Sequence, residues 1–201
     1  MANTQATFGF KETGYLGGGA PDYQMSKYTI QSTNGTQIGL GDPVQYANAT
    51  SPFIVQATGS NATVTPIIGI FKGCMFIPTA GGAPQFSPFW PGTSSLNGTA
   101  YVIDAPNAFF LVAALNTAIT SANIGNVVNF TTGAPTTVGA GNSVATIDQS
   151  TATGTGTTAS LLPFRIVGLY PGVGNGSDPT TAFNWAIVGF NNQLNRSTVG
   201  A

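Results

Sequence analysis

Residues 162–169 read LPFRIVGL and residues 183–190 read FNWAIVGF. Both stretches are dominated by β-branched and aromatic side chains, the composition of buried β-strands. Turn residues such as Asn34-Gly35 and Pro91-Gly92 separate further short stretches of the same character: Tyr28–Gln31, Pro43–Tyr46, Phe53–Gln56, Ile67–Phe71, Ala100–Ile103, Phe109–Ala114 and Val127–Phe130. Repeated short strands with turns between them are typical of an all-β sandwich or barrel. Only Leu115–Ile124 indicates a helix, and a short one.

Charged residues are scarce in this chain of 201 residues. They make up 5% of it, against roughly 25% in a typical soluble domain. The chain has no His and one Cys, so the usual zinc sites and Ser-His or Cys-His pairs lack their residues. Five Lys and Arg give a net charge of −1, which is not the basic footprint of a nucleic-acid-binding protein. The composition therefore predicts a protein that is not an enzyme, with no cofactor, no metal and no nucleic-acid partner.

The remaining candidates for chemistry are better explained as structural features. Gly172–Gly176 runs into the turn Ser177-Asp178-Pro179 rather than into a helix, so it does not fit a phosphate-binding loop. Glu12, the only Glu, stands beside Lys11 with no second acid nearby for acid–base work. Cys74 has apolar flanks, which predicts a buried, small hydrophobic residue.

Membrane insertion is not expected. The opening MANTQATFGF lacks the basic and apolar regions of a secretion signal, and the apolar run Ala108–Leu115 is far shorter than the ~20 residues of a membrane helix. We therefore expect synthesis in a cytoplasm and no membrane partner. Lys and Arg are absent between Lys72 and Arg165. Because so little charge gives little self-repulsion, we expect much of this surface to be buried in an assembly.

The chain is expected to divide into an arm and one domain. Residues 1–24 contain a Gly triplet and four aromatic residues, too little to build a core of their own. We interpret them as an extended N-terminal arm that packs on something else, and residues 25–201 as a single β-domain. Within that domain, residues 131–160 are rich in Thr and Gly. They form either a flexible loop or a pair of edge strands, and composition does not decide between these.

Aromatic side chains cluster at Phe86, Phe89 and Trp90, and Trp185 lies in a second apolar stretch. Such residues most often become core or interface wedges, but exposed rings can also stack on a sugar. The cluster therefore leaves two interpretations open. One is an aromatic interface. The other is a glycan platform, which would make the protein a carbohydrate- or receptor-binding β-module of a fibre or surface appendage.

Motifs at both ends of the chain carry a family resemblance. They are Phe8-Gly9-Phe10-Lys11, Tyr15-Leu16-Gly17-Gly18, Tyr28-Thr29-Ile30, the IGLGDPV stretch 38–44, the LPFRIVGL stretch 162–169 and the AIVGFNNQ stretch 186–193. This layout resembles the capsid decoration proteins of tailed bacteriophages, also called cement or head-stabilisation proteins. That family often has a His after its last strand, whereas here Gln193-Leu194 follow Asn191-Asn192.

The resemblance implies a compact β-barrel or sandwich, β-tulip-like, behind an N-terminal arm. It further implies a structural virion protein, made in the host cytoplasm, that binds the outside of the phage head. Such a protein stabilises the capsid by bridging major capsid subunits, commonly as a trimer. We expect Phe8, Phe10, Tyr15 and Leu16 to anchor the arm to the capsid or to a neighbouring subunit. Deleting residues 1–20 should then abolish attachment and leave the β-domain folded.

Overall fold

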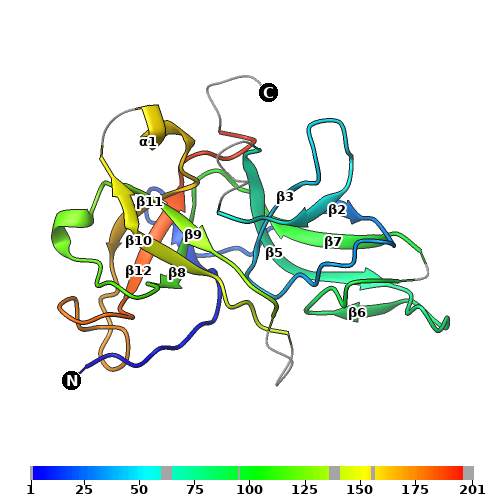
Figure 1. The fold of residues 1–201 in the computed structure, drawn as a ribbon, viewed down its shortest axis with the longest axis horizontal. Coiled ribbons are helices and arrows are strands. Elements are labelled where there is room, and N and C mark those ends of the chain that lie inside the picture. Colours follow the sequence, from blue (N-terminus) through cyan, green and yellow to red (C-terminus); the bar gives the residue numbers. More distant parts are fainter. Residues whose placement is uncertain (1, 60–64, 95, 136–140, 155–156, 197–201) are drawn as a thin grey trace.

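The chain folds into two antiparallel β-sheets, as the strand pattern predicts. The computed structural model describes residues 2–59, 65–94, 96–135, 141–154 and 157–196. Figure 1 shows the first sheet in the left half of the molecule and the second in the right half. Each of the nine predicted strands coincides with an observed one, so the all-β expectation is confirmed.

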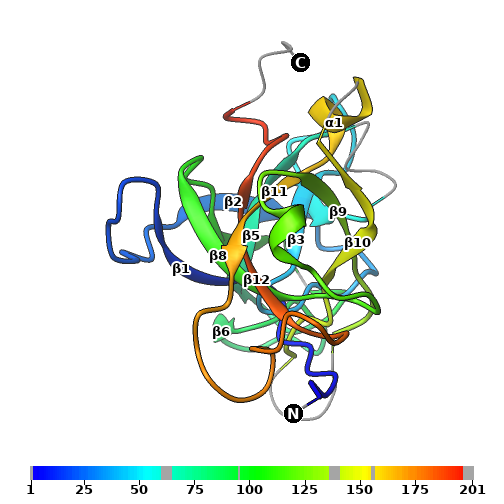
Figure 2. The same cartoon turned by 90° about the vertical axis from the view of Figure 1, so that its left-hand side faces the viewer.

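The first sheet curls until its two sides meet. Its strand order is β1 (Lys11–Tyr15), β8 (Ala108–Ala113), β12 (Trp185–Phe190), β11 (Phe164–Leu169), β9 (Val127–Thr131) and β10 (Thr146–Thr153). Figure 2 shows β1 on one side of this sheet and β10 on the other. Just beyond β8, Ala114 forms a bridge with Ile147 of β10, and the Leu115 amide donates to the Ile147 carbonyl (2.9 Å). The strands β8, β12, β11, β9 and β10, in that spatial order, therefore close into a barrel.

The second sheet is open. Its strand order is β2 (Ser26–Ile30), β7 (Gly98–Ile103), β5 (Ile67–Phe76), β3 (Pro43–Tyr46) and β4 (Ile54–Gln56), and β6 (Gln85–Ser87) pairs with the far end of β5. The long strand β5 is buried on both faces. Ile67 and Ile70 pack into the core of the barrel, whereas Ile68 and Phe71 pack into a second core. Strand β5 therefore joins the two halves of the molecule.

Each half is filled by its own set of large side chains. The barrel core holds five phenylalanines, Phe10, Phe110, Phe130, Phe164 and Phe190. The second core is built around Trp90, whose indole Nε1 donates to the Asn34 carbonyl (3.0 Å). Burial of this much aromatic and β-branched surface is the main driving force for the fold.

Helical structure is slight in the described segments. A single 3-10 turn, Ser121–Asn123, lies inside the stretch predicted to be helical, and α1 (Thr157–Leu161) was not predicted. None of the described helices is long and apolar enough to span a bilayer.

Among the described residues of the Thr- and Gly-rich stretch 131–160, one strand, β10, lies wholly within the stretch, where a pair of edge strands or a loop was expected. Strand β10 pairs with β9, and the hydroxyls of Thr131 and Thr146 share a hydrogen bond (2.8 Å) across that pair. Residues 136–140 and 155–156 lie outside the described residues.

The expected boundary between arm and domain is wrong. Phe10 is fully buried in the barrel core, and β1 pairs with β8 through Glu12 and Phe110 and through Tyr15 and Ala108. The sequence KETGY conceals this strand because it holds two charged residues and a Gly, which are depleted in strands. The N-terminal segment is therefore part of the fold, and the domain does not begin at residue 25.

Candidate functional site

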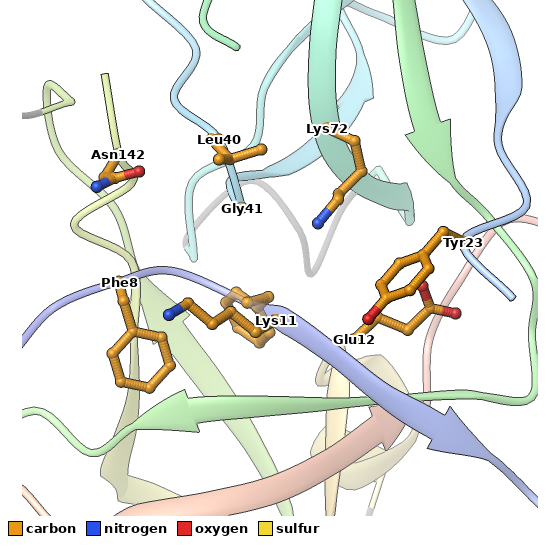
Figure 3. A pocket seen from close by; sticks show the side chains of 9 residues that line it. Phe8, Lys11, Glu12, Tyr23, Leu40, Gly41, Lys72 and Asn142 are labelled. Carbon is orange, nitrogen blue, oxygen red and sulfur yellow. The ribbon is translucent and has the colours of Figure 1, made fainter. Parts of the chain in front are cut away.

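A cavity of about 290 Å³ lies where the N-terminal segment crosses between the two sheets. Figure 3 shows Lys72 extending from β5 toward it, Lys11 lying on the Phe8 side and Glu12 on the Tyr23 side. Three of the few charged side chains of this chain thus line one cavity. The full lining is Phe8, Phe10, Lys11, Glu12, Tyr23, Leu40, Gly41, Lys72 and Asn142.

Glu12 is the least expected member of this lining. Neighbouring residues of a strand point to opposite faces, so β1 directs Lys11 outward and Glu12 inward. Glu12 is only 6% exposed, and no donor meets hydrogen-bond geometry at either of its buried carboxylate oxygens. The Tyr15 side chain is near them, since burial, Asp22 and Glu12 all raise the pKa of the Tyr15 hydroxyl. Lys72 is partly buried, and burial lowers the pKa of its ammonium group, while the negative charge of Glu12 acts in the opposite direction. The two side chains therefore interact through their charges without a hydrogen bond between them.

Two aromatic rings stand beside the ammonium groups. The Lys11 Nζ lies 4.8 Å from the centre of the Phe8 ring, and the Lys72 Nζ lies 5.9 Å from that of Tyr23. Tyr23 has a backbone φ of 54°, in the left-handed region that bulky residues seldom adopt. The backbone thus holds this tyrosine at the cavity in an uncommon conformation.

The turn Gly41-Asp42-Pro43 forms the opposite wall of the cavity. Asp42 is fully buried and accepts hydrogen bonds from the Gly39 amide (2.6 Å), the Gln56 amide group (2.7 Å) and the Ser143 hydroxyl. Burial raises the pKa of Asp42 to about 6, although these hydrogen bonds oppose the shift. The same turn presents the Gly41 carbonyl, which accepts from the Phe10 amide (2.9 Å). Asp42 therefore ties β4 and the 141–145 segment to the turn that borders the cavity.

Lys11 and Lys72 bring ammonium groups to this lining, and these groups can only donate hydrogen bonds. Within the described parts of the chain, no group of three or more His, Cys, Asp or Glu side chains is placed to hold a metal ion.

The four predicted arm anchors have different environments. Phe10 is a core residue, and Phe8 packs edge-on against Trp185 with ring centres 4.9 Å apart. The Tyr15 hydroxyl donates to the Asp22 carboxylate, and burial raises the pKa of that hydroxyl. Only Leu16, 63% exposed, offers its side chain to a partner. The expectation that all four contact another molecule is therefore wrong for Phe10.

Leu16 borders a shallow groove on the barrel surface, which we call the Leu16 groove. Ile124 and Val167 are exposed in this groove beside Leu16. Both arginines of the chain, Arg165 and Arg196, also line it. Arg165 donates to the Asn191 side chain (3.3 Å) and Arg196 to the Phe190 carbonyl (2.7 Å). The full lining is Leu16, Phe109, Ile124, Gly125, Arg165, Ile166, Val167, Gly189, Phe190 and Arg196.

The predicted aromatic platform is reduced to one exposed ring. Phe86 is 62% exposed, whereas Phe89 is partly buried against Gly141. Trp90 is fully buried, so its assignment to an exposed platform is wrong: the second core encloses it. Trp185 is covered by Phe8, Tyr170 and Gly176.

Phe86 belongs to a small apolar face of the second sheet, which we call the Phe86 face. Met75 stands directly opposite Phe86 in the pairing of β5 with β6, and the Tyr101 ring centre lies 5.9 Å from that of Phe86. Met75 is itself exposed.

A scan against protein-family models, a search of curated proteins and a search of solved structures each found no match for this chain. The fold defines an all-β protein of two antiparallel sheets.

Proposed function

We propose that this chain is a structural virion protein that binds the outside of a phage head and stabilises the capsid by bridging major capsid subunits, as a trimer. The observation that carries the proposal is the presence of separate exposed apolar surfaces on the two halves of the molecule. The barrel has the Leu16 groove, and the second sheet has the Phe86 face. A bridging protein needs two such contact surfaces, one for each neighbour.

The composition of both surfaces supports this role. Exposed apolar patches mark interaction sites, and protein interfaces are enriched in aromatic residues, Met and Arg. The Leu16 groove contains two arginines, and the Phe86 face contains Met75 and Tyr101. Because only 5% of the residues are charged, association would desolvate few charged side chains. Binding only to the assembled head stabilises that head by mass action.

The partners under this proposal are the major capsid protein and two further copies of this chain. The trimer and the site of action, the capsid exterior after assembly in the host cytoplasm, follow from the family resemblance. The alternative, a carbohydrate- or receptor-binding β-module of a phage fibre, has less support at the predicted platform. Among Phe86, Phe89 and Trp90, only Phe86 exposes most of its side chain.

The proposal is tested by cosedimentation of the purified protein with expanded phage heads that lack it. We expect saturable binding at a fixed ratio to the major capsid protein, and light scattering should give the mass of a trimer. Leu16→Asp and Phe86→Asp should each weaken binding at least tenfold, because each places a carboxylate in an apolar contact.

Val173→Asp is the matched control, because Val173 is 95% exposed at a loop tip on neither surface. It adds the same charge and should bind as the wild type does. A folded wild-type protein that stays in the supernatant at all concentrations would overturn the proposal.

A further inference from the structure

We propose that the Leu16 groove binds an extended segment of a different protein, one that places an aliphatic side chain beside an Asp or Glu carboxylate. The aliphatic side chain packs on the apolar floor of the groove, and the carboxylate accepts hydrogen bonds from Arg165. The inference rests on the proposed function for the identity of the partner, and it assigns this groove to the capsid protein rather than to the contact between copies of this chain.

The first argument is the apolar floor of the groove. Gly189 of β12 pairs with Phe109 of β8 on one side and with Arg165 of β11 on the other. Opposite residues of paired strands share one face of a sheet, and Phe190, the next residue of β12, packs into the barrel core. Phe109, Gly189 and Arg165 therefore form one row on the outer face of the barrel.

Gly189 lets the Phe109 ring lie over this row. Its φ lies outside the left-handed region, so the backbone itself does not demand a glycine here. A Cβ at this position would come within 3.1 Å of two Phe109 ring atoms and 3.6 Å of Val167. Phe109 and Val167 thus form a floor, with the exposed side chains of Leu16 and Ile124 beside it. An aliphatic side chain is the kind of group that this surface takes out of water.

The second argument is the uncompensated positive charge of the groove. Both arginines of the chain line it, and none of the six acidic residues does. Arg165 donates to the neutral Asn191 side chain, and Arg196 donates to the carbonyls of Pro106 and Phe190. A guanidinium group matches the geometry of a carboxylate. The charge of the groove therefore calls for an acidic residue on the partner.

The third argument is that a second copy of this chain is a poor source of that residue. Each of the six carboxylates is already buried or hydrogen-bonded within the chain. The buried ones are Glu12 and Asp42, and the hydrogen-bonded ones are Asp22, Asp104, Asp148 and Asp178. Among the exposed large hydrophobic residues of the described segments, only Tyr23 adjoins an acidic residue, and it is aromatic. A different protein therefore supplies the segment.

The test is a selection of short linear peptides, from a random library displayed on yeast, against the full-length protein. We expect the enriched peptides to combine Asp or Glu with Leu, Ile or Val. Their binding should weaken as salt is raised, because salt screens exposed charges. A library that yields no binder, or binders without acidic residues, would overturn the proposal.

Variants connect the selected peptides to the groove. Arg165→Glu should weaken their binding at least about tenfold, because it replaces attraction by repulsion. Val167→Ser should also weaken binding, since it removes part of the apolar floor. Lys27→Glu is the matched control: it reverses the same charge at an exposed position of β2 that does not line the groove. Unchanged affinity in Arg165→Glu, or an equal loss in Lys27→Glu, would contradict the assignment to this groove.

Two further measurements separate this inference from the proposed function. If Arg165→Glu cosediments with phage heads as the wild type does, the inference is wrong and the proposed function stands. If the acidic peptides bind through Arg165 but the wild-type protein does not bind heads, the specificity of the groove stands and the proposed function is wrong. Self-association that Arg165→Glu abolishes would make a second copy the occupant and would overturn the inference.

Discussion

The ring of Phe10 stacks on the ring of Phe164, with centres 4.4 Å apart and planes 22° apart. Phe10 directly precedes β1, and Phe164 begins β11, more than 150 residues later in the chain. This contact makes the N-terminal segment part of the barrel core.

Replacing Phe10 with Ala should therefore destabilise the protein by about 3–5 kcal/mol, the range for a buried Phe that leaves a cavity. Urea unfolding followed by circular dichroism measures this change. Leu16→Ala is the control and should change stability by less than about 0.5 kcal/mol, because Leu16 is exposed. Equal stability of wild type and Phe10→Ala would contradict the observed packing.

The same contact revises the expectation for the truncated protein. Removing residues 1–20 takes away Phe10 and all of β1. We now expect this deletion to unfold or strongly destabilise the barrel, so it cannot test arm binding by itself.

Asn3 fastens the N-terminus to the loop before β12. Its side-chain amide donates to the Asp178 carbonyl and to the Thr181 hydroxyl (2.8 Å each), and its side-chain oxygen accepts from the Gly176 amide (3.0 Å). Asn3→Ala should release this loop and speed hydrogen exchange at Gly176 at least about tenfold, the equivalent of one or two lost hydrogen bonds.

Thr4→Ala is the control for the Asn3 variant. Thr4 bonds to Asn175 through its backbone amide and carbonyl (2.7 and 3.0 Å), which the substitution keeps. If Asn3→Ala and Thr4→Ala exchange at the same rate as the wild type, the Asn3 contacts do not hold the loop.

Most strands were predictable because their residues are of the types that are enriched in buried strands. Stretches such as Ile67–Phe71 and Phe183–Phe190 are apolar, β-branched or aromatic, and they became the strands of the two cores. Strands β1 and β6 were not predicted, and β10 lies in the stretch 131–160, where composition left a loop and a pair of edge strands open. Charged, polar or small residues occupy most of their positions. Strand β1 pairs with β8, which is distant in sequence, whereas β6 and β10 pair with the strands that precede them in the chain.

The cavity could not be predicted in the same way. Its charged residues come from two segments, with Lys11 and Glu12 on β1 and Lys72 on β5. The alternation of side chains along β1 directs Lys11 and Glu12 to opposite faces, and no pattern in the sequence places Lys72 near either of them. Phe10, Glu12 and Gly14 occupy alternate positions and therefore share one face of the strand. The large apolar side chain of Phe10 was the feature of the sequence that could have indicated that this face is buried. Trp90 was misjudged because the segment that encloses it, including Ile38, is remote in sequence.

Asp42 should give the stability of the protein a specific pH dependence. Burial raises its folded-state pKa from 3.8 to about 6, so between these values the folded state holds a proton that the unfolded state releases. Stability should therefore decrease as pH rises from about 4 to about 6, by roughly 3 kcal/mol in all, and then level off. Urea unfolding at a series of pH values measures this dependence.

Asp42→Asn should remove the decrease, because Asn does not titrate. The hydrogen-bonded carboxyls of Asp22 and Asp178 have lowered pKa values. The pH range in which they change the stability therefore lies below the range of Asp42. A wild-type protein whose stability is flat or rises between pH 4 and 6 would contradict the environment described for Asp42.

Cys74 should be unreactive in the folded protein. The prediction that it is buried is confirmed, and burial raises the pKa of its thiol to about 12. Because the thiolate is the reactive form, a disulfide reagent such as DTNB should label the native protein only on the timescale of unfolding. Rapid labelling of one thiol per native chain would show that Cys74 is accessible. The urea-unfolded protein should react at once and serves as the control.

The most direct test of the central claim is the thermal stability of phage heads with and without this protein. Expanded heads that lack it are saturated with the purified chain, and the temperature of head disruption is followed by light scattering. If the protein is a cement, that temperature should rise with occupancy and level off when the sites are full, since a ligand of the assembled state stabilises that state. Fully occupied heads that break down at the same temperature as bare heads would contradict a stabilising role.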